Sequence, residues 1–111
     1  MKKLFVIALC AISSSVFAGF NPDNSNLKTI EQAEALPNHS TVVLEGYIVS
    51  QAKKKEFYFK DMQNKLIRLK IEDHIWHGLD VSPNTKVRIQ GKIDKYLLKS
   101  HIEVYQIDKI N

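Results

Sequence analysis

Aromatic and basic side chains share one set of alternate positions in the segment from Thr41 to Ile71. Aromatic rings stack on sugars and basic groups pair with anions, so this combination suits a glycan, a phosphorylated glycan or another small anionic ligand. Alternate side chains of a β-strand lie on the same face, which places these groups together on the outside of a sheet. The predicted ligand-binding residues are Tyr47, Tyr58, Arg68 and Lys70 on this face, Lys53, Lys54 and Lys55 in the loop after its first strand, and Tyr96 and Lys99 in the last loop.

The lysines of the first loop do not make a specific site by themselves. Each lysine near an anionic surface contributes about 1 kcal/mol, so three contribute about 3 kcal/mol, which is less than the ~4 kcal/mol of millimolar binding. They could tune a site built by Tyr47, Tyr58 and Arg68. The alternative is an ordinary solvated sheet face, with a lysine-rich loop that protects a strand edge from aggregation.

A second polar cluster surrounds Trp76. His74 and His77 could lie on one face of a helical turn, and together with Asp73 and Asp80 they resemble a divalent-metal site. Two histidines at this spacing are an unspecific signal. The alternative is a polar turn in which Trp76 plugs the open end of a barrel, so we predict no metal site and no cofactor.

The acidic residues do not form a recognisable catalytic group. They are scattered over predicted strand ends and turns, and the sequence has no Gly-x-Ser-x-Gly motif. We expect Asp61 to cap a turn, and Asp94 with Lys95 to form a surface pair or a turn bond and not a catalytic dyad. The sequence therefore predicts a protein that is not an enzyme.

Residues 1–18 have the features of an export signal. A basic start precedes an apolar run over residues 4–12, and Val16 and Ala18 occupy the −3 and −1 positions of a small-residue cleavage region. The alternative, a membrane-anchoring helix, would need about 20 apolar residues. We predict a mature chain that begins at Gly19, lies in the periplasm and does not span the membrane.

Cleavage changes what the composition implies. It removes Cys10, the single cysteine, which excludes an internal disulfide, a zinc–thiolate site and a cysteine nucleophile. It also removes Lys2 and Lys3, leaving 14 of the 16 basic residues against 12 acidic ones, a net charge of +2 in place of +4. This is not a nucleic-acid-binding composition. A lipoprotein anchor at Cys10 is disfavoured because the segment before it is too short.

A short helix and five strands would position the candidate residues. Thr29 and Gln32 have the spacing of a capping box, and Pro37 ends the helix. Gly46 and Gly91 stand inside strand patterns, where glycine marks a bulge or a bend. The predicted elements are a helix at 29–36, strands at 41–50, 56–60, 65–71, 87–95 and 102–110, and a helical turn at 73–78 that Asp73 caps and Gly78 ends.

These elements fit one domain at 28–111, preceded by the signal and a loose lead-in at 19–27. Five strands, two of them bent by glycine, predict a mainly-β fold, a five-stranded OB-fold Greek-key barrel with a short N-terminal helix and a helical turn between strands three and four. The competing architecture is a meander sandwich. Closure is favoured because it covers the apolar face and hides the strand edges.

Five motifs follow one another along the chain: V-x-L-x-G-x-I at 42–48, F-x-F-x-D at 57–61, I-x-L-x-I at 67–71, W-x-G-x-x-V at 76–81 and V-x-I-x-G-x-I-D-K at 87–95. With a Gly19-Phe20 start, this order resembles the bacterial OB-fold (BOF) family of the YgiW/YdeI type over nearly all of the mature chain. The resemblance implies a periplasmic, non-enzymatic barrel that is associated with envelope stress tolerance and binds a small or envelope-derived ligand. Lys92, where an acidic residue is common, and the pair Leu97-Leu98 depart from the family pattern.

Three functions remain open. The first is a binding module for an anionic or glycan envelope component, such as a peptidoglycan fragment or a lipid headgroup. The second is a protein-interaction module in which Tyr47, Tyr58 and Tyr105 contact an envelope partner. The third is single-stranded nucleic-acid binding, a frequent task of OB folds, which export makes the least favoured, so we expect no nucleic acid.

Overall fold

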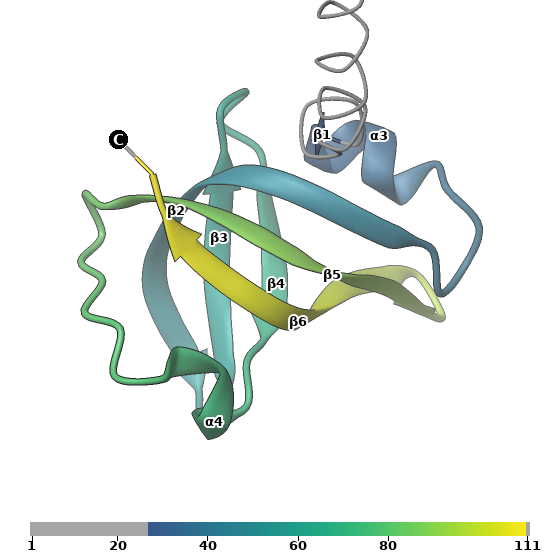
Figure 1. Ribbon diagram of the computed structural model, residues 1–111. Coiled ribbons are helices and arrows are strands. Elements are labelled where there is room, and N and C mark those ends of the chain that lie inside the picture. Colours follow the sequence, from purple (N-terminus) through teal and green to yellow (C-terminus); the bar gives the residue numbers. More distant parts are fainter. Residues whose placement is uncertain (1–26, 111) are drawn as a thin grey trace, which may run out of the picture.

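A computed structural model describes residues 27–110, which form a β-barrel with two short helices (Figure 1). The predicted signal at 1–18 and the lead-in as far as residue 26 lie outside the described residues. Within residues 27–110, no helix has the length and apolar character needed to cross a membrane. The elements are β1 (Leu27–Lys28), α3 (Ile30–Glu34), β2 (Thr41–Lys53), β3 (Glu56–Asp61), β4 (Leu66–Lys70), α4 (Asp73–Trp76), β5 (Lys86–Tyr96) and β6 (Lys99–Lys109).

The sheet closes on itself through the long strand β2. The strand order is β1-β2-β3-β4-β6-β5, and β2 also pairs with β5. The first part of β2, from Thr41 to Tyr47, pairs with β5, while the part from Gly46 to Lys53 pairs with β3. The short β1 adds to β2 in parallel. The predicted five-stranded OB barrel is therefore confirmed, with one additional two-residue strand.

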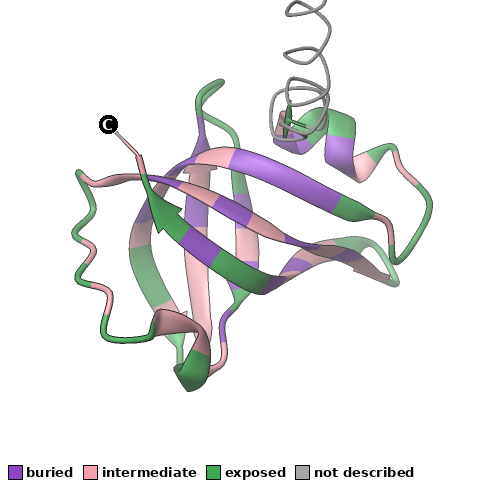
Figure 2. Ribbon diagram, viewed as in Figure 1, coloured by how far each residue is buried: buried purple, intermediate pink, exposed green. Residues whose placement is uncertain are grey.

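Alternation of side chains places one apolar face inside the barrel. Leu44, Phe59, Leu69 and Ile89, one from each of four strands, all have 0% exposed surface. Figure 2 shows buried and exposed segments alternating along the strands. Each large side chain buried in this way stabilises the fold by about 1.5–3 kcal/mol. The predicted inward face is confirmed, and the aromatic and basic positions lie on the outer face.

Two glycines stand where neighbouring strands approach closely. A Cβ atom on Gly46 would lie 2.1 Å from the carbonyl oxygen of Lys60 on β3, and one on Gly91 would lie 2.3 Å from that of Glu103 on β6. Real Cβ atoms do not come so close to backbone. These positions therefore require glycine for strand packing, as the sequence indicated by placing glycine at bends.

A bulge in β6 lies opposite Gly91. Gln90 pairs with Gln106 but the next residue, Gly91, pairs with Val104, so Tyr105 is an extra residue without a partner on β5. The spacing of apolar residues in the sequence, which slips by one between Val104 and Ile107, predicts a bulge at this place, and the structure confirms it. An extra residue of this kind increases the local bend of a strand.

Helix α3 begins with the predicted capping box. The Thr29 hydroxyl oxygen accepts a hydrogen bond from the Gln32 amide at 3.1 Å, and the Gln32 side chain accepts one from the Thr29 amide at 2.9 Å. Ile30 and Ala33 are fully buried against the barrel. A five-residue helix is not stable alone, so this burial holds it in place.

Asp61 joins the helix to the β3–β4 turn. Its carboxylate accepts hydrogen bonds from the amides of Gln63 and Lys65 in the turn, at 2.9 and 3.0 Å. Its other oxygen accepts one from the Ile30 amide, at 2.8 Å, in the first turn of α3. The predicted turn cap is confirmed, and the link to the helix is a further role that local sequence does not indicate.

Two loops are shorter than predicted. Lys53 pairs with Glu56 inside the β2–β3 hairpin, so the expected loop at 51–55 reduces to a two-residue turn. Tyr96 pairs with Lys99 in the same way, and the expected loop at 96–100 reduces to Leu97 and Leu98. Register shifts at residues 48–50 and 51–53 let β2 twist and continue pairing, which the alternation pattern does not reveal.

Two further boundaries also differ. Leu27 pairs with Val43 in β1, so this residue is not part of a loose lead-in. Asp73 is the first residue of α4 and not its cap, because Glu72 is the N-cap residue and makes no side-chain capping bond. The helix ends at Trp76, and its C-cap residue His77 has a left-handed φ of 47°, just before Gly78 at 76°.

Candidate functional site

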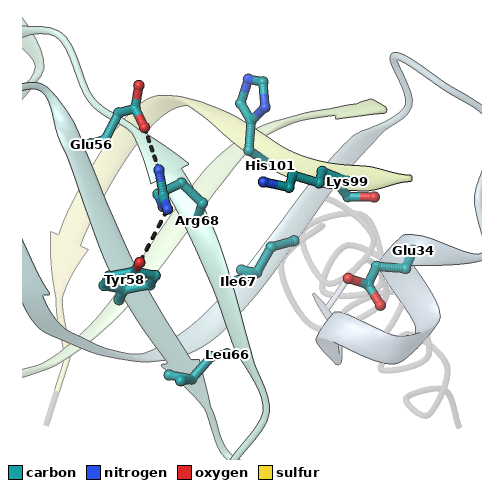
Figure 3. Close-up of a pocket in the computed structure, with 9 residues that line it drawn as sticks. Glu34, Glu56, Tyr58, Leu66, Ile67, Arg68, Lys99 and His101 are labelled. Atoms are coloured by element: carbon teal, nitrogen blue, oxygen red, sulfur yellow. Dashed lines mark hydrogen bonds and ion pairs between the residues drawn. The ribbon is translucent and has the colours of Figure 1, made fainter. Parts of the chain in front are cut away.

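A pocket opens in the barrel wall where β4 and β6 separate, beside helix α3 (Figure 3). The parallel pairing of these strands begins at Arg68 opposite His101 and covers three residue pairs. The residues before that first pair are therefore not joined across the seam. The pocket has a volume of about 360 Å³, within the range of about 300–1,000 Å³ that is common for small-molecule sites. It is lined by Glu34, Glu56, Tyr58, Leu66, Ile67, Arg68, Lys99, Ser100 and His101.

Arg68 is the most constrained polar group of the pocket. Its Nη1 donates to Glu56 Oε1 at 2.5 Å, and its Nη2 donates to the Tyr58 hydroxyl at 3.1 Å. The guanidinium carbon lies 4.8 Å from the centre of the Tyr58 ring. These contacts hold the pKa of Glu56 below its ordinary value, chiefly through the hydrogen bond from Arg68, and raise the pKa of Arg68.

The Nε atom of Arg68 differs from the other two nitrogens. It is shielded from solvent and has no hydrogen-bond partner among residues 27–110. A buried donor without a partner costs about 1–3 kcal/mol. The guanidinium is thus fixed in place with one donor group still unpaired.

The charges around the pocket nearly balance. Glu56 balances the positive charge of Arg68. Lys65 balances the negative charge of Glu34, because its ammonium lies 3.3 Å from the Glu34 carboxylate. Lys99 is exposed and belongs to none of the ion pairs found within residues 27–110. In Figure 3 its side chain reaches from β6 toward the side of the pocket that holds Arg68. One positive charge is therefore left over.

His101 lines the pocket from β6 and shares an acidic neighbour with His39. Its Nε2 lies 3.5 Å from Asp94, and His39 Nε2 lies 3.7 Å from the other oxygen of the same carboxylate.

The structure therefore brings together three of the predicted site residues, Tyr58, Arg68 and Lys99. Tyr47 lies on the outer face of β2 opposite Lys60 and Lys86, and does not line this pocket. Tyr96 is 71% exposed at the end of the β5–β6 hairpin. The predicted set is thus divided over more than one surface.

The lysines of the first turn are also separate from the pocket. Lys55 Nζ lies 3.0 Å from Glu72, and Lys70 Nζ lies 3.9 Å from the same carboxylate. The hydrogen bond between Lys55 and Glu72 raises the pKa of Lys55 and lowers that of Glu72. Lys53 and Lys54 are exposed. Glu72 offsets part of this positive charge, so the turn is a weaker anion site than its composition indicates.

Sequence reasoning missed several residues of the pocket. Glu56 had a usable signal, because it stands two residues before Tyr58 and so shares its face. The others come from α3 and from the first residues of β6, and alternation within one hairpin does not place them there. The missed residues are Glu34, Glu56, Leu66, Ile67, Ser100 and His101.

The cluster around Trp76 closes the far end of the barrel. The Trp76 ring packs edge-on against Phe57, with centroids 5.3 Å apart and planes at 71°. Ile75 and Leu79 also pack on the core. Within residues 27–110, no group of three or more His, Cys, Asp or Glu side chains is placed to hold a metal ion. This packing supports the plug interpretation.

A second pocket adjoins this plug, between α4 and β6. It has a volume of about 400 Å³, and Trp76, His77 and Tyr105 are among its lining residues. Tyr58 and Tyr105 therefore line different pockets. A protein partner that contacted both would have to span two separate surfaces.

Comparisons with known proteins agree on one family. A family model described as "Bacterial OB fold (BOF) protein" matches residues 10–109. An uncharacterised protein of Haemophilus influenzae is 32% identical over 120 aligned positions, which cover 98% of each chain. Protein YgiW of Escherichia coli K12 is 35% identical over 88 residues, covering 79% of this chain and 67% of that protein. The calcium-regulated OB-fold protein CarO of Pseudomonas aeruginosa is 27% identical over 114 residues, covering 99% and 97%.

The solved structure of YgiW from E. coli supports the same assignment. It superposes on this chain with a TM-score of 0.72 at 34% identity, covering 76% of this chain and 89% of that chain. The similarity thus extends from the sequence motifs to the arrangement of the strands. This chain belongs to the bacterial OB-fold (BOF) family, as the order of its motifs predicted.

Proposed function

We propose that this protein is an exported periplasmic binding module that supports envelope stress tolerance by holding a small anionic or glycan envelope ligand in the pocket between β4 and β6. The observation that carries this proposal is the state of Arg68. Two of its nitrogens are fixed by Glu56 and Tyr58, and its shielded Nε has no partner within residues 27–110. The Arg68 side chain is still 34% exposed, so an acceptor oxygen on a ligand can bond the held guanidinium, and a hydrogen bond to a charged group contributes about 1.5–3 kcal/mol.

The remaining lining groups narrow the ligand class. Tyr58 and Leu66 offer aromatic and apolar surface, which suits a sugar ring. Lys99 supplies one uncompensated cation, which suits a single carboxylate or phosphate. A peptidoglycan fragment combines both features, and a free lipid headgroup shares the anionic one. A nucleic acid presents a regular row of phosphates, for which one free cation is a poor match.

Titration followed by NMR tests this proposal. A muropeptide is added to ¹⁵N-labelled protein, with glycerol phosphate as the headgroup probe and an uncharged chitin disaccharide as the sugar probe. We expect shifts at Tyr58, Arg68, Lys99 and Ser100, and the largest ones with the muropeptide. Shifts confined to Tyr105 and Trp76 would place binding in the other pocket and contradict the proposal.

A matched pair of variants separates the pocket from the rest of the barrel. Arg68→Gln removes the unpaired donor and its charge, and we expect at least tenfold weaker binding, the equivalent of about 1.4 kcal/mol. Arg88→Gln is the control, because Arg88 also pairs with a glutamate across strands, at 2.6 Å from Glu45, but does not line the pocket. Equal affinity in both variants would remove Arg68 from the site.

The proposed location has its own test. Mass spectrometry of the protein recovered from a periplasmic extract is expected to give a chain that starts at Gly19. Full-length protein in the cytosol would contradict export, whatever the result of the binding experiment.

A further inference from the structure

The β5–β6 hairpin ends in an apolar tip, which we define as Tyr96, Leu97 and Leu98. Their exposed surfaces are 71%, 84% and 101%. Figure 1 shows the hairpin projecting from the barrel on the side away from α4. Single exposed apolar residues are ordinary on protein surfaces, but a contiguous group marks an interaction site.

The backbone conformation of the tip indicates that these residues do not serve the stability of the fold. Tyr96 pairs with Lys99, so Leu97 and Leu98 are the two residues of a tight turn, and Leu97 has a φ of 57°. Turns of this kind favour Asn and Gly, because other residues pay a steric cost in the left-handed region. Leucine here breaks a local rule without adding to the core, which is a property of functional positions.

Lysines flank the tip on both strands. Lys95 precedes Tyr96 in β5 and pairs with Ser100, and Lys99 begins β6. Neither side chain belongs to an ion pair found within residues 27–110, whereas Lys92, further along the hairpin, lies 3.9 Å from Glu103. The free lysines therefore stand next to the apolar tip.

This arrangement matches the chemistry of a bilayer surface. Leucines can enter the boundary of the acyl chains, and a tyrosine ring is favoured at the depth of the headgroups. Lysine stems lie along apolar surface while their ammonium groups reach anionic phosphates. A protein partner would also cover apolar surface, but the two free cations give complementarity to an anionic lipid layer.

We propose that the tip, together with Lys95 and Lys99, docks this protein on the surface of an anionic lipid bilayer. The hairpin lies in the interface and does not cross the membrane. Lys99 also lines the pocket between β4 and β6, so docking would hold that pocket close to the lipid surface. The proposal does not depend on which ligand the pocket takes.

Flotation with vesicles tests the docking. The chain from Gly19 to Asn111 is mixed with vesicles of phosphatidylethanolamine and phosphatidylglycerol, or with vesicles of phosphatidylcholine alone. We expect flotation with the anionic vesicles, at least several-fold weaker flotation with the neutral ones, and a decrease as salt is raised. Absence of flotation with anionic vesicles, or equal flotation with both kinds, would overturn the proposal.

A double variant identifies the contacting residues. Leu97→Asn with Leu98→Ser keeps a turn-compatible backbone and is expected to lower partitioning at least tenfold. Met62→Ser is the control, because Met62 is 49% exposed in the turn between β3 and β4, away from the tip. Unchanged partitioning of the double variant would overturn the proposal, as would an equal loss in the control.

Two further measurements exclude other occupants of the tip. Leu98→Trp is expected to show fluorescence quenching by brominated lipid, beyond the background from Trp76 in α4. Sedimentation of the wild type without lipid is expected to give a monomer. A dimer that the double variant dissociates would identify the tip as a contact between copies and overturn the lipid assignment.

Discussion

Replacing Asp61 with alanine is expected to lower the free energy of unfolding by about 4 kcal/mol. Asp61 is 3% exposed, and its carboxylate accepts three backbone hydrogen bonds, from Ile30 at 2.8 Å, Gln63 at 2.9 Å and Lys65 at 3.0 Å. The substitution removes all three acceptor contacts at once. It also separates helix α3 from the β3–β4 turn.

The size of this loss depends on how well each backbone amide can bond to water once the carboxylate is removed. The Ile30 amide is buried, so leaving it unpaired costs about 1–3 kcal/mol. The amides of Gln63 and Lys65 are partly exposed, so each loses about 0.5–1.5 kcal/mol. The range is therefore about 2–6 kcal/mol, a large fraction of the ~5–15 kcal/mol that stabilises a typical domain.

Two more variants sharpen the test. Asp61→Asn keeps one acceptor oxygen, which can serve either the helix or the turn but not both, so we expect about half the loss. Asp80→Asn is the control, because Asp80 is exposed and surface changes of this kind stay within about 0.5 kcal/mol.

Urea unfolding followed by the fluorescence of Trp76 is the assay. This single tryptophan is the last residue of α4 and packs on Phe57, at the end of the barrel away from the β3–β4 turn (Figure 1). It therefore reports unfolding of the whole barrel. A loss below about 0.5 kcal/mol in Asp61→Ala would refute the reasoning, since it would mean that the three amides are satisfied without the carboxylate. Loss of the Ile30 amide's protection from hydrogen exchange would locate the effect.

Two further predictions concern strand packing and charge. Gly46→Ala is expected to lower the free energy of unfolding by more than about 2 kcal/mol, because its Cβ would lie 2.1 Å from a carbonyl oxygen. Gly78→Ala should lower it by only about 1–2 kcal/mol in the same urea experiment, because its Cβ would meet no atom within 4 Å and the cost comes from the φ of 76°. The carboxyl of Glu56 should titrate by NMR below its ordinary 4.5, so its stabilising pair with Arg68 is present above that pH and is lost as the pH falls through the lowered pKa. In Arg68→Gln the Glu56 midpoint should return toward 4.5, and a midpoint that stayed low would contradict the assigned cause.

Most of the fold could be predicted because its signals are local. The two-residue period assigns inward residues such as Leu44 and Ile89, and it places Tyr58 and Arg68 outward. The hairpin turn at Asp61 then sets Tyr58 opposite Arg68, as the structure has them. The slip in period before Ile107 revealed the bulge at Tyr105. Each of these follows from neighbours along the chain.

The composition of the pocket could not be predicted, because it depends on contacts between residues that are far apart along the chain. His101 faces Arg68 through the parallel pairing of β4 with β6, which are separated along the chain by α4 and β5. No local pattern fixes the register of such a distant pair, nor the point at which the two strands separate. Glu34 reaches the same pocket from α3. The ion pair between Lys55 of the lysine-rich turn and Glu72 likewise joins residues on either side of β3 and β4, so no local pattern indicates it.

Two departures from what folding favours lie on the same side of the barrel. One is the shielded Nε of Arg68, for which residues 27–110 offer no hydrogen-bond partner, and the other is Leu97 in a left-handed turn. Lys55 is also left-handed, with a φ of 67°, but its carbonyl accepts a bond from the Ile71 amide and its ammonium pairs with Glu72. Leu97 is 84% exposed and gains little from packing. Because costs that the fold does not offset are typical of functional positions, this side of the barrel, where Lys99 joins the pocket to the tip, is where ligand and lipid binding should be sought first.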